Sequence, residues 1–305
     1  MNKLVFLYNA RSNKGLKDKE LDSICNVSVS MGYDPRVIFS TSTENIEDTL
    51  FGDTTYDSGD LIISIGGDGT FHNLVRNTFN KDVTVSHLPH GTTNDIKRVL
   101  GLLNKNIEDD LRNILNGEEK YLDIPILNGT PFTYSAGCGK LLNIPYSVPA
   151  RLKKTFGHLA YLSAGVNELV FNKVHQIPFY METKKFNIEE TAAIILITNQ
   201  SRVAGFDNFI KDSVVDDGEF EVSILAAKDN IDVIKSIIKN LKSGLSNNKN
   251  YLKFHTNHVS FMFEYEPEFC IDGDKYDGNT RRVDINIGKT KVLVPLHRKP
   301  NQFKR

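Results

Sequence analysis

The sequence has little that would suit a secreted or membrane-spanning protein. Its 305 residues include only three cysteines, Cys25, Cys138 and Cys270, and their wide spacing forms no metal-binding or disulfide pattern. Such sparse cysteine usage is typical of a reducing compartment. The apolar run at residues 4–8 is too short for a signal peptide, and the run at 192–197 is too short for a membrane span. We therefore expect a soluble, cytoplasmic protein.

The chain also lacks an excess of charge of either sign. Its formal net charge is −1, which argues against general binding to nucleic acid. Hydrophobic residues make up 40% of the chain and charged residues 25%, so a sizeable core can be buried. At roughly 100–200 residues per domain, this length predicts two domains.

The first part of the chain alternates strand and helix patterns. Strands are expected at residues 4–8, 36–39, 60–65 and 83–88. Helices are expected at about 16–31, from 41 through 50, after 70, after 95 and around 107–115. Such alternation predicts a mostly parallel sheet covered on both faces. We expect a Rossmann-like, three-layer α/β domain over residues 1–123.

After Tyr121 short strands dominate. The dipeptide Asn128-Gly129 between two apolar runs is a strong hairpin signal. Further strands are expected at 174–182, 185–188, 192–198, 219–225, 251–255, 258–264 and 282–287, with helices at about 156–172 and 234–244. This pattern predicts an antiparallel β-sandwich over residues 124–289. A final strand at 291–296 is compatible with either domain, so the segment of about 290–305 is a candidate for return to the first.

The sharpest local signal is the loop Gly66-Gly67-Asp68-Gly69-Thr70 between a predicted strand and a predicted helix. Glycines let backbone N–H groups approach a phosphate closely, and a helix N-terminus adds donors and a favourable dipole. A carboxylate repels phosphate, so Asp68 makes sense if it meets the phosphates through Mg²⁺. The alternative is a tight turn with Asp68 as a helix cap.

This loop is neither a Walker A loop nor a dinucleotide fingerprint. It resembles the signature shared by diacylglycerol, sphingosine and NAD kinases and phosphofructokinases. A second loop, Pro89-His90-Gly91-Thr92-Thr93-Asn94-Asp95, resembles that of the diacylglycerol and sphingosine kinase branch. The resemblance extends along nearly the whole chain through Asn9 to Asn13, Thr41, Asp216-Asp217-Gly218 and Asp272-Gly273-Asp274. The soluble bacterial diacylglycerol kinases are the most similar group.

The resemblance implies roles for individual residues. ATP would be bound by Asn9, Ala10, Arg11, Ser12, Asn13, Thr41, Gly66, Gly67, Asp68, Gly69, Thr70, Asn73, Thr92, Asn94, Asp95 and Asp123. Within this set, Asp68, Asp95 and Asp123 would organise Mg²⁺ at the phosphates. A separate structural Mg²⁺ would be held by the Val214 and Glu219 carbonyls and the Asp217 side chain. Asp274 would be the general base that takes the proton from the lipid hydroxyl, and with Asp68 it forms the expected catalytic pair.

Each of these roles has a simpler alternative. Asp95 suits a helix cap, and Asp123 suits a turn at a strand end. Both the Asp216-Asp217-Gly218 segment and the Asp272-Gly273-Asp274 segment are good turn sequences. The chain also departs from the family, whose base is usually glutamate, and it carries Phe71-His72-Asn73 where relatives usually have Leu-Asn-Glu.

The resemblance implies a lipid kinase that uses ATP and Mg²⁺ on diacylglycerol, with no nucleic-acid partner. Basic stretches such as residues 151–154 are candidates to hold the enzyme against an anionic membrane surface during turnover, with ordinary solvated charge as the alternative. A homodimer is implied by resemblance alone. Two alternatives stay open. One is an NAD kinase, which shares the glycine loop, and the other is a nucleotide-binding regulatory protein with weak catalysis.

Overall fold

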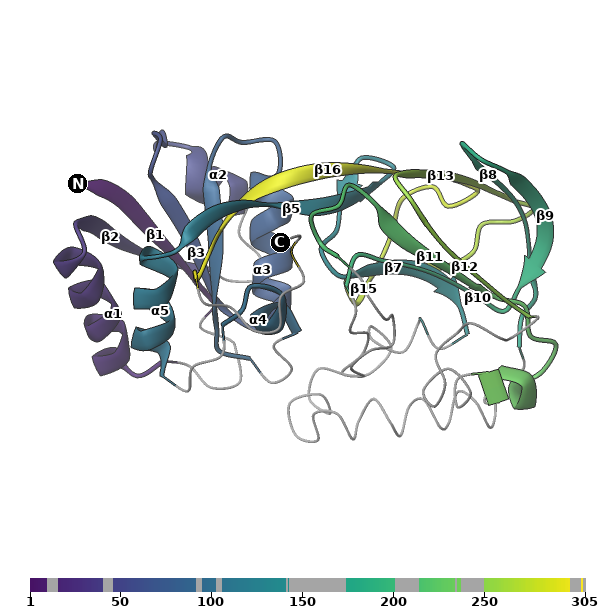
Figure 1. The fold of residues 1–305 in the computed structure, drawn as a ribbon, viewed down its shortest axis with the longest axis horizontal. Coiled ribbons are helices and arrows are strands. Elements are labelled where there is room, and N and C mark those ends of the chain that lie inside the picture. Colours follow the sequence, from purple (N-terminus) through teal and green to yellow (C-terminus); the bar gives the residue numbers. More distant parts are fainter. Residues whose placement is uncertain are drawn as a thin grey trace. The chain divides into compact units, whose positions relative to one another are not determined.

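The structure is a computed structural model that forms two compact units (Figure 1). It describes residues 1–9, 16–40, 46–91, 95–102, 106–140, 142, 174–200, 214–233, 235, 236, 250–296 and 303. Unit 1 comprises Met1–Leu122 and Lys289–Arg305, and unit 2 comprises Asp123–Gly288. Each unit is described by itself below.

Unit 1 is built on a parallel sheet. Its strands are β1 (Asn2–Asn9), β2 (Tyr33–Ser40), β3 (Leu61–Gly66), β4 (Thr84–Pro89) and the last residues of β16 (Arg282–Val294). They lie in the order β2-β1-β3-β4-β16, and every neighbouring pair is parallel. The central strand β3 is buried along its whole length, as a continuous apolar run in a covered parallel sheet should be.

Helices cover both faces of this sheet. They are α1 (Asp18–Ser30), α2 (Ile46–Phe51), α3 (Asp68–Thr78), α4 (Asp95–Val99) and α5 (Ile107–Leu115). In the sheet, β2 lies on one side of β1 and β3 lies on the other, so the connections β1–β2 and β2–β3 run in opposite directions across the sheet. Because such crossovers are right-handed, α1 and α2 lie on opposite faces. Accordingly α1 packs against α5, whereas α3 packs against α2 and α4.

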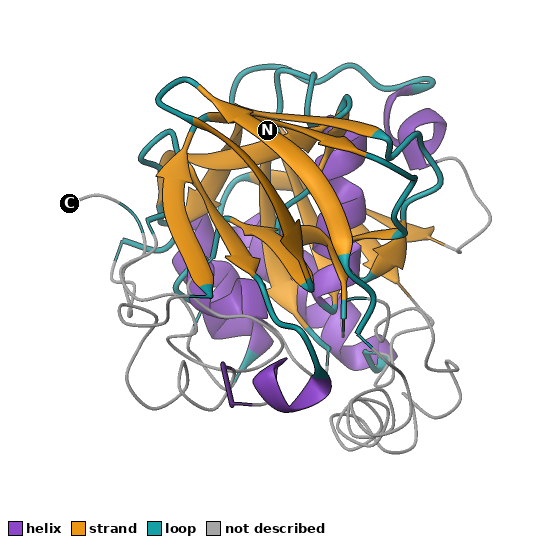
Figure 2. Cartoon of the chain, turned by 90° about the vertical axis from the view of Figure 1, so that its right-hand side faces the viewer, coloured by secondary structure: helices purple, strands orange, loops and turns teal. Residues whose placement is uncertain are grey.

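Unit 2 is a sandwich of two antiparallel sheets, whose strands face the viewer in Figure 2. One sheet runs β16-β13-β8-β9, and the other runs β12-β11-β10-β7-β14-β15. The strands are β5 (Glu118–Leu127), β6 (Thr130–Pro131), β7 (Ser135–Gly139), β8 (Ile177–Thr183), β9 (Asn187–Ala192), β10 (Ile194–Thr198), β11 (Phe220–Leu225), β12 (Tyr251–Thr256), β13 (His258–Phe263), β14 (Phe269–Ile271) and β15 (Asp274–Lys275).

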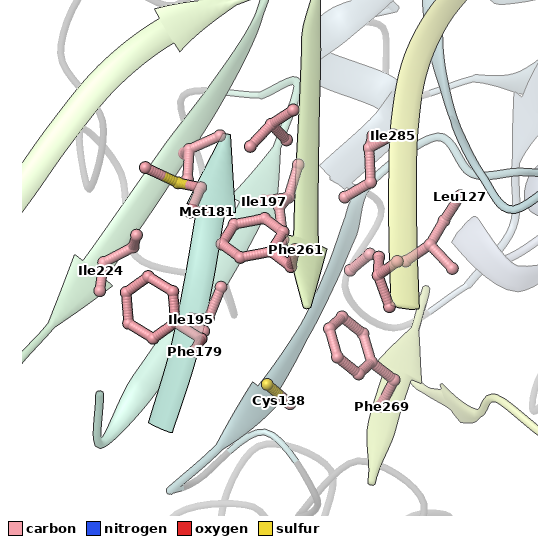
Figure 3. Close-up of a cluster of buried hydrophobic side chains, with 14 of the residues drawn as sticks. Leu127, Cys138, Phe179, Met181, Ile195, Ile197, Ile224, Phe261, Phe269 and Ile285 are labelled. Carbon is pink, nitrogen blue, oxygen red and sulfur yellow. The ribbon is translucent and has the colours of Figure 1, made fainter. Parts of the chain in front are cut away.

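The core of unit 2 lies between its two sheets (Figure 3). Strand β13 shows how the sequence builds it, because Val259, Phe261 and Phe263 are buried while the residues between them are not. The rings of Phe261 and Phe263 stack with centroids 5.9 Å apart. This period of two places one face of the strand in the core and the other face outside it.

The structure confirms the expected combination of an α/β part and an antiparallel β part. It also confirms the hairpin turn, since Asn128 and Gly129 have φ values of 47° and 86° between β5 and β6. One detail was wrong: residues 282–287 and 291–296 were expected as separate strands. They form the single strand β16, whose first half pairs with β13 and whose second half pairs with β4. The expected helices at 156–172 and 234–244 lie outside the described residues, apart from residues 235 and 236.

Candidate functional site

The glycine loop lies where β3 ends and α3 begins. Gly66 is the last residue of β3, Gly67 is the helix N-cap, and Asp68 lies in the first helical turn. A Cβ on Gly66 would lie 2.3 Å from Oγ1 of Thr70, so no other residue fits there without a shift. The first N–H groups of a helix have no partner within the helix, and the helix dipole favours an anion beside them. The loop is therefore suited to a phosphate group.

The two sequence loops are hydrogen-bonded to each other. The backbone N–H of His90 donates to the Gly66 carbonyl at 2.6 Å. One carboxylate oxygen of Asp68 accepts from the backbone N–H of Ile96 at 3.0 Å. This second bond ties the first turn of α3 to the first turn of α4. Asp68 is therefore the residue whose side chain joins the first loop to α4, and it is only partly buried.

Other expected nucleotide contacts lie at the same edge of the sheet. Because β1, β3 and β4 are parallel neighbours, Asn9, Gly66 and Pro89 end their strands side by side. Asp95 is buried at the start of α4, and Asn73 is exposed on α3. The expected contacts that lie outside the described residues are Ala10, Arg11, Ser12, Asn13, Thr41, Thr92 and Asn94.

A buried histidine lies beneath the glycine loop, on the strand next to β3. His87 is 0% exposed, and its Nδ1 atom is 2.8 Å from the hydroxyl of Ser64 on the neighbouring strand. Burial lowers the pKa of His87 to about 4, the carboxylate of Asp68 raises it in part, and His72 lowers it further. The sequence signal was Ser64 in the apolar run of β3 and the pair Ser86-His87 in β4.

Acid should destabilise unit 1 through His87. The unfolded side chain has a pKa near 6.5, so between roughly pH 6.5 and pH 4 the unfolded chain binds a proton that the folded chain does not. The free energy of unfolding therefore falls as the pH falls through this window. His87→Leu lacks this titration, so within this window its free energy of unfolding should rise relative to that of wild type by about 1.4 kcal/mol for each pH unit of acidification. Urea unfolding at several pH values measures this difference. The control is His175→Leu, which replaces an exposed histidine. Equal pH slopes for His87→Leu and wild type would contradict the prediction.

In unit 2, Asp123 is buried and joins β5 to the segment that precedes β11. Its backbone N–H donates to the Val215 carbonyl at 2.8 Å, and its carboxylate accepts from the Gly218 N–H at 2.6 Å. The Asn199 side chain donates to its carbonyl at 2.7 Å. These bonds give Asp123 a clear structural role in addition to any role at the nucleotide.

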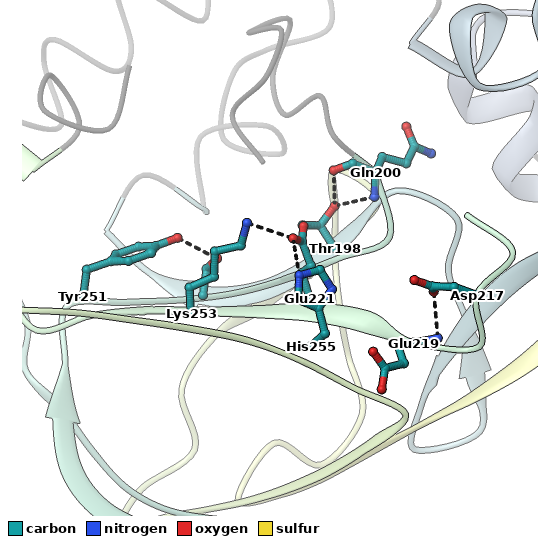
Figure 4. Close-up of polar contacts among 9 residues, drawn as sticks. Thr198, Gln200, Asp217, Glu219, Glu221, Tyr251, Lys253 and His255 are labelled. Carbon is teal, nitrogen blue, oxygen red and sulfur yellow. Dashed lines mark hydrogen bonds and ion pairs between the residues drawn. The ribbon is translucent and has the colours of Figure 1, made fainter. Parts of the chain in front are cut away.

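The residues expected to hold a structural Mg²⁺ lie in the same segment (Figure 4). Glu219 donates its backbone N–H to a carboxylate oxygen of Asp217 at 3.1 Å, across a turn in which Gly218 has a φ of +83°. In the described part of the chain, no group of three or more His, Cys, Asp or Glu side chains is arranged to hold a metal. Mg²⁺ commonly binds one or two carboxylates and keeps several waters. The donors here, Asp217 and the backbone oxygens of Val214 and Glu219, are all oxygen and suit that ion.

Sequence reasoning missed a buried carboxylate on β11. Glu221 is 1% exposed and forms ion pairs with Lys253 at 2.8 Å and with His255 at 3.2 Å on the adjacent strand β12 (Figure 4). Burial raises the pKa of Glu221, while Lys253 and His255 lower it. The only signal in the sequence was a charged residue inside the apolar run of β11.

The expected base, Asp274, follows a tight turn between β14 and β15. Asp272 and Gly273 have φ values of 52° and 91°, and Ile271 pairs with Asp274 across the turn. The Asp274 side chain is exposed. The Asp272 carboxylate accepts the backbone N–H groups of Thr133, Tyr134 and Ser135 at 3.2, 2.9 and 3.2 Å. Asp272 therefore anchors the turn that presents Asp274.

Removing this anchor should destabilise unit 2. Asp272→Ala deprives three backbone N–H groups of a charged acceptor and places alanine at a positive φ. Hydrogen bonds to charged groups contribute about 1.5–3 kcal/mol each, and because Asp272 is only partly buried we expect a total loss of about 2–3 kcal/mol. Asp272→Asn keeps one acceptor and tolerates the φ, so its loss should be smaller. Urea unfolding measures both, with Asp277→Ala as an exposed control. An alanine variant as stable as the control would refute the anchor.

The sequence of this chain is similar to those of known proteins. Residues 3–125 match the family model of the diacylglycerol kinase catalytic domain. A diacylglycerol kinase of Bacillus subtilis (strain 168) is 29% identical over 312 aligned positions, covering 99% of each chain. A diacylglycerol kinase of Staphylococcus aureus (strain JH9) is 28% identical over 262 positions, covering 85% of this chain and 78% of the relative.

Solved structures share the fold. A chain from Bacillus anthracis (strain Sterne) has a TM-score of 0.77 at 19% identity. A diacylglycerol kinase structure from the same strain has a TM-score of 0.72 at 18% identity. Both comparisons cover 96% of this chain and 97% of the other. These two structures establish the fold of the chain.

Proposed function

We propose that this chain, whose residues 3–125 carry a diacylglycerol kinase catalytic domain, transfers the γ-phosphate of ATP to the hydroxyl group of diacylglycerol. The observation that carries the proposal is the position of Asp68. Its carboxylate lies in the first turn of α3, beside the phosphate-binding glycines, and it is held there by the N–H of Ile96. A phosphate loop with a fixed carboxylate is suited to phosphate that is bound together with a cation.

Unit 1 would bind ATP through its strand-end loops. The Gly66–Thr70 loop offers backbone N–H groups and a helix dipole to the phosphates. Asn9 lies at the end of the neighbouring strand β1, so it would contact the nucleotide at the same edge of the sheet. The proposal assigns further nucleotide contacts to Asn73, to residues 10–13 and to Thr41, Thr92 and Asn94. The role of this loop is to fix the γ-phosphate for attack, because phosphoryl transfer depends mainly on positioning and charge.

Magnesium would be held at two places. The proposal assigns Asp68, Asp95 and Asp123 as the carboxylates that would hold the ion at the phosphates, and such an ion would neutralise charge on the transferring group. Asp217 and the carbonyls of Val214 and Glu219 supply oxygen ligands for a second, structural ion. The fit rests on the donor chemistry described above, since oxygen-only sets suit Mg²⁺.

Asp274 would act as the general base. Its exposed carboxylate accepts the proton of the lipid hydroxyl while the hydroxyl oxygen forms a bond to the γ-phosphorus and the bond to ADP breaks. Phosphatidic acid and ADP are the products. The turn anchored by Asp272 fixes the backbone from which this side chain extends.

The substrate resides in a membrane, so we propose that the enzyme works at the membrane surface. None of the described helices is long and apolar enough to cross a bilayer. Peripheral contact with anionic lipid and assembly into a homodimer are both part of the proposal. Sedimentation with vesicles of differing anionic content would test the first, and light scattering would test the second.

Phosphate transfer to a panel of acceptors tests the function directly. Labelled γ-phosphate from ATP and Mg²⁺ would be offered to diacylglycerol, phosphatidylglycerol, ceramide, sphingosine and undecaprenol in mixed micelles, with NAD as a soluble acceptor. Label in diacylglycerol above all other acceptors is the expected result. Label in NAD alone would favour an NAD kinase. Tight ATP binding without transfer to any acceptor would favour a regulatory protein.

A further inference from the structure

Ser64 and His87 form a polar pair inside an otherwise apolar region of the sheet. They lie directly opposite each other in the parallel register of β3 and β4, and both side chains are 0% exposed. Strands β3 and β4 end at the two loops assigned to the nucleotide. A hydrogen bond between Ser64 and His87 therefore joins the two strands just before those loops begin.

The Ser64 hydroxyl bonds to the ring of His87 in either tautomer. It is 2.8 Å from Nδ1 of His87 and 3.5 Å from the Ser86 carbonyl. A hydroxyl can donate to Nδ1, or it can accept the Nδ1 proton and donate to the carbonyl. Nε2 is buried and has no hydrogen-bond partner among the described residues. A buried polar atom without a hydrogen-bond partner is destabilising, so an apolar residue would have been more stable there.

The ring also contacts the helix that carries Asp68. The centroids of His87 and Phe71 are 5.6 Å apart, and Phe71 is a fully buried residue in the first turns of α3. Asp68 and His72 of the same helix are close enough to influence the charge of the ring. His87 thus lies under the start of α3 and is held from the side by Ser64.

We infer that His87 is a positioning residue for nucleotide binding: its bond to Ser64 sets how the ends of β3 and β4, and hence the Gly66–Thr70 loop and Asp68, are placed for the phosphates. This inference rests on the proposed function of the loop. It assigns His87 no contact with the nucleotide. The alternative is that His87 only stabilises the fold. If His87 positions the loop, loss of its bond to Ser64 weakens nucleotide binding, whereas a purely stabilising residue would leave binding unchanged.

Two conservative variants separate these roles. His87→Leu fills the core but removes both ring nitrogens. His87→Asn places an amide group near the position of Nδ1, so it keeps a partner for Ser64 and lacks Nε2. Ser64→Ala removes the other end of the bond with a small change in volume. The double variant Ser64→Ala/His87→Leu tests whether the two side chains act as one unit.

The readouts are the affinity for a fluorescent ATP analogue without lipid, the KM values for ATP and for lipid, and thermal unfolding of each variant. We expect His87→Leu and Ser64→Ala each to weaken analogue binding on the order of tenfold, because small displacements at a phosphate site are costly. The double variant should be no weaker than the single ones. His87→Asn should bind within about twofold of wild type, and KM for lipid should be unchanged throughout.

Three outcomes would overturn the inference. If wild type binds the analogue and His87→Leu binds it equally well, His87 does not position the loop, although the proposed function stands. If His87→Asn is as weak as His87→Leu, the Ser64 bond is not the cause. If wild type binds no nucleotide at all, the proposed function fails and the inference fails with it.

Discussion

Replacing Asp68 with alanine is expected to lower the rate of phosphate transfer on the order of a thousandfold, the largest effect of any change in unit 1. The carboxylate provides the negative charge next to the phosphate loop and accepts the N–H of Ile96. Alanine removes both, so the cation proposed at the phosphates would lose a ligand and the start of α4 would lose its hydrogen bond to Asp68. Transfer of labelled phosphate to diacylglycerol at saturating ATP measures the loss.

The two roles of Asp68 can be separated. Asp68→Asn keeps an oxygen that accepts from Ile96 but removes the charge, so the fold of the loops should survive while transfer stays low. The control is Asp53→Ala, an exposed carboxylate of the same unit, which should behave as wild type. If Asp68→Asn retained near-normal transfer, the charge of Asp68 would have no part in catalysis.

The glycine loop was predictable from the sequence because its information is local. A strand, a run of glycines and a helix start follow one another in the chain, and the structure has β3, Gly66-Gly67 and α3 in that order. The turn at Asn128-Gly129 was predictable for the same reason, since its positive φ values are preferences of those two residues. The alternation of strands and helices likewise indicated the parallel sheet of unit 1.

Other features depended on residues far apart in the chain. The Ser64–His87 pair requires the register of β3 with β4, and the anchor of the Asp272 turn lies at residues 133–135. No local pattern contains either contact. The continuous strand β16 was missed for a similar reason, because Gly288 suggests a break, whereas pairing with β13, β4 and β5 keeps the strand extended. The proposed roles of the site residues stay predictions.

Replacing Asp274 with asparagine should reduce kcat on the order of 10²- to 10⁴-fold, which is the range that general base catalysis supplies. Asparagine is nearly isosteric and exposed here, so the hairpin anchored by Asp272 should remain intact. Because the change removes only the acceptor of the hydroxyl proton, KM for ATP should stay near its original value. Steady-state kinetics with diacylglycerol at varied ATP would show this split.

Asp277→Asn is the matched control, since it removes an exposed carboxylate three residues further along and should leave kcat unchanged. Asp274→Glu tests reach, because it restores the carboxylate on a side chain one methylene longer. We expect it to be far more active than Asp274→Asn, since a base needs only to come within hydrogen-bond distance of its proton. If Asp274→Asn kept full kcat, the proton would have to leave through another group. If Asp274→Glu were as inactive as Asp274→Asn, the turn would hold its carboxylate at one fixed distance from the substrate.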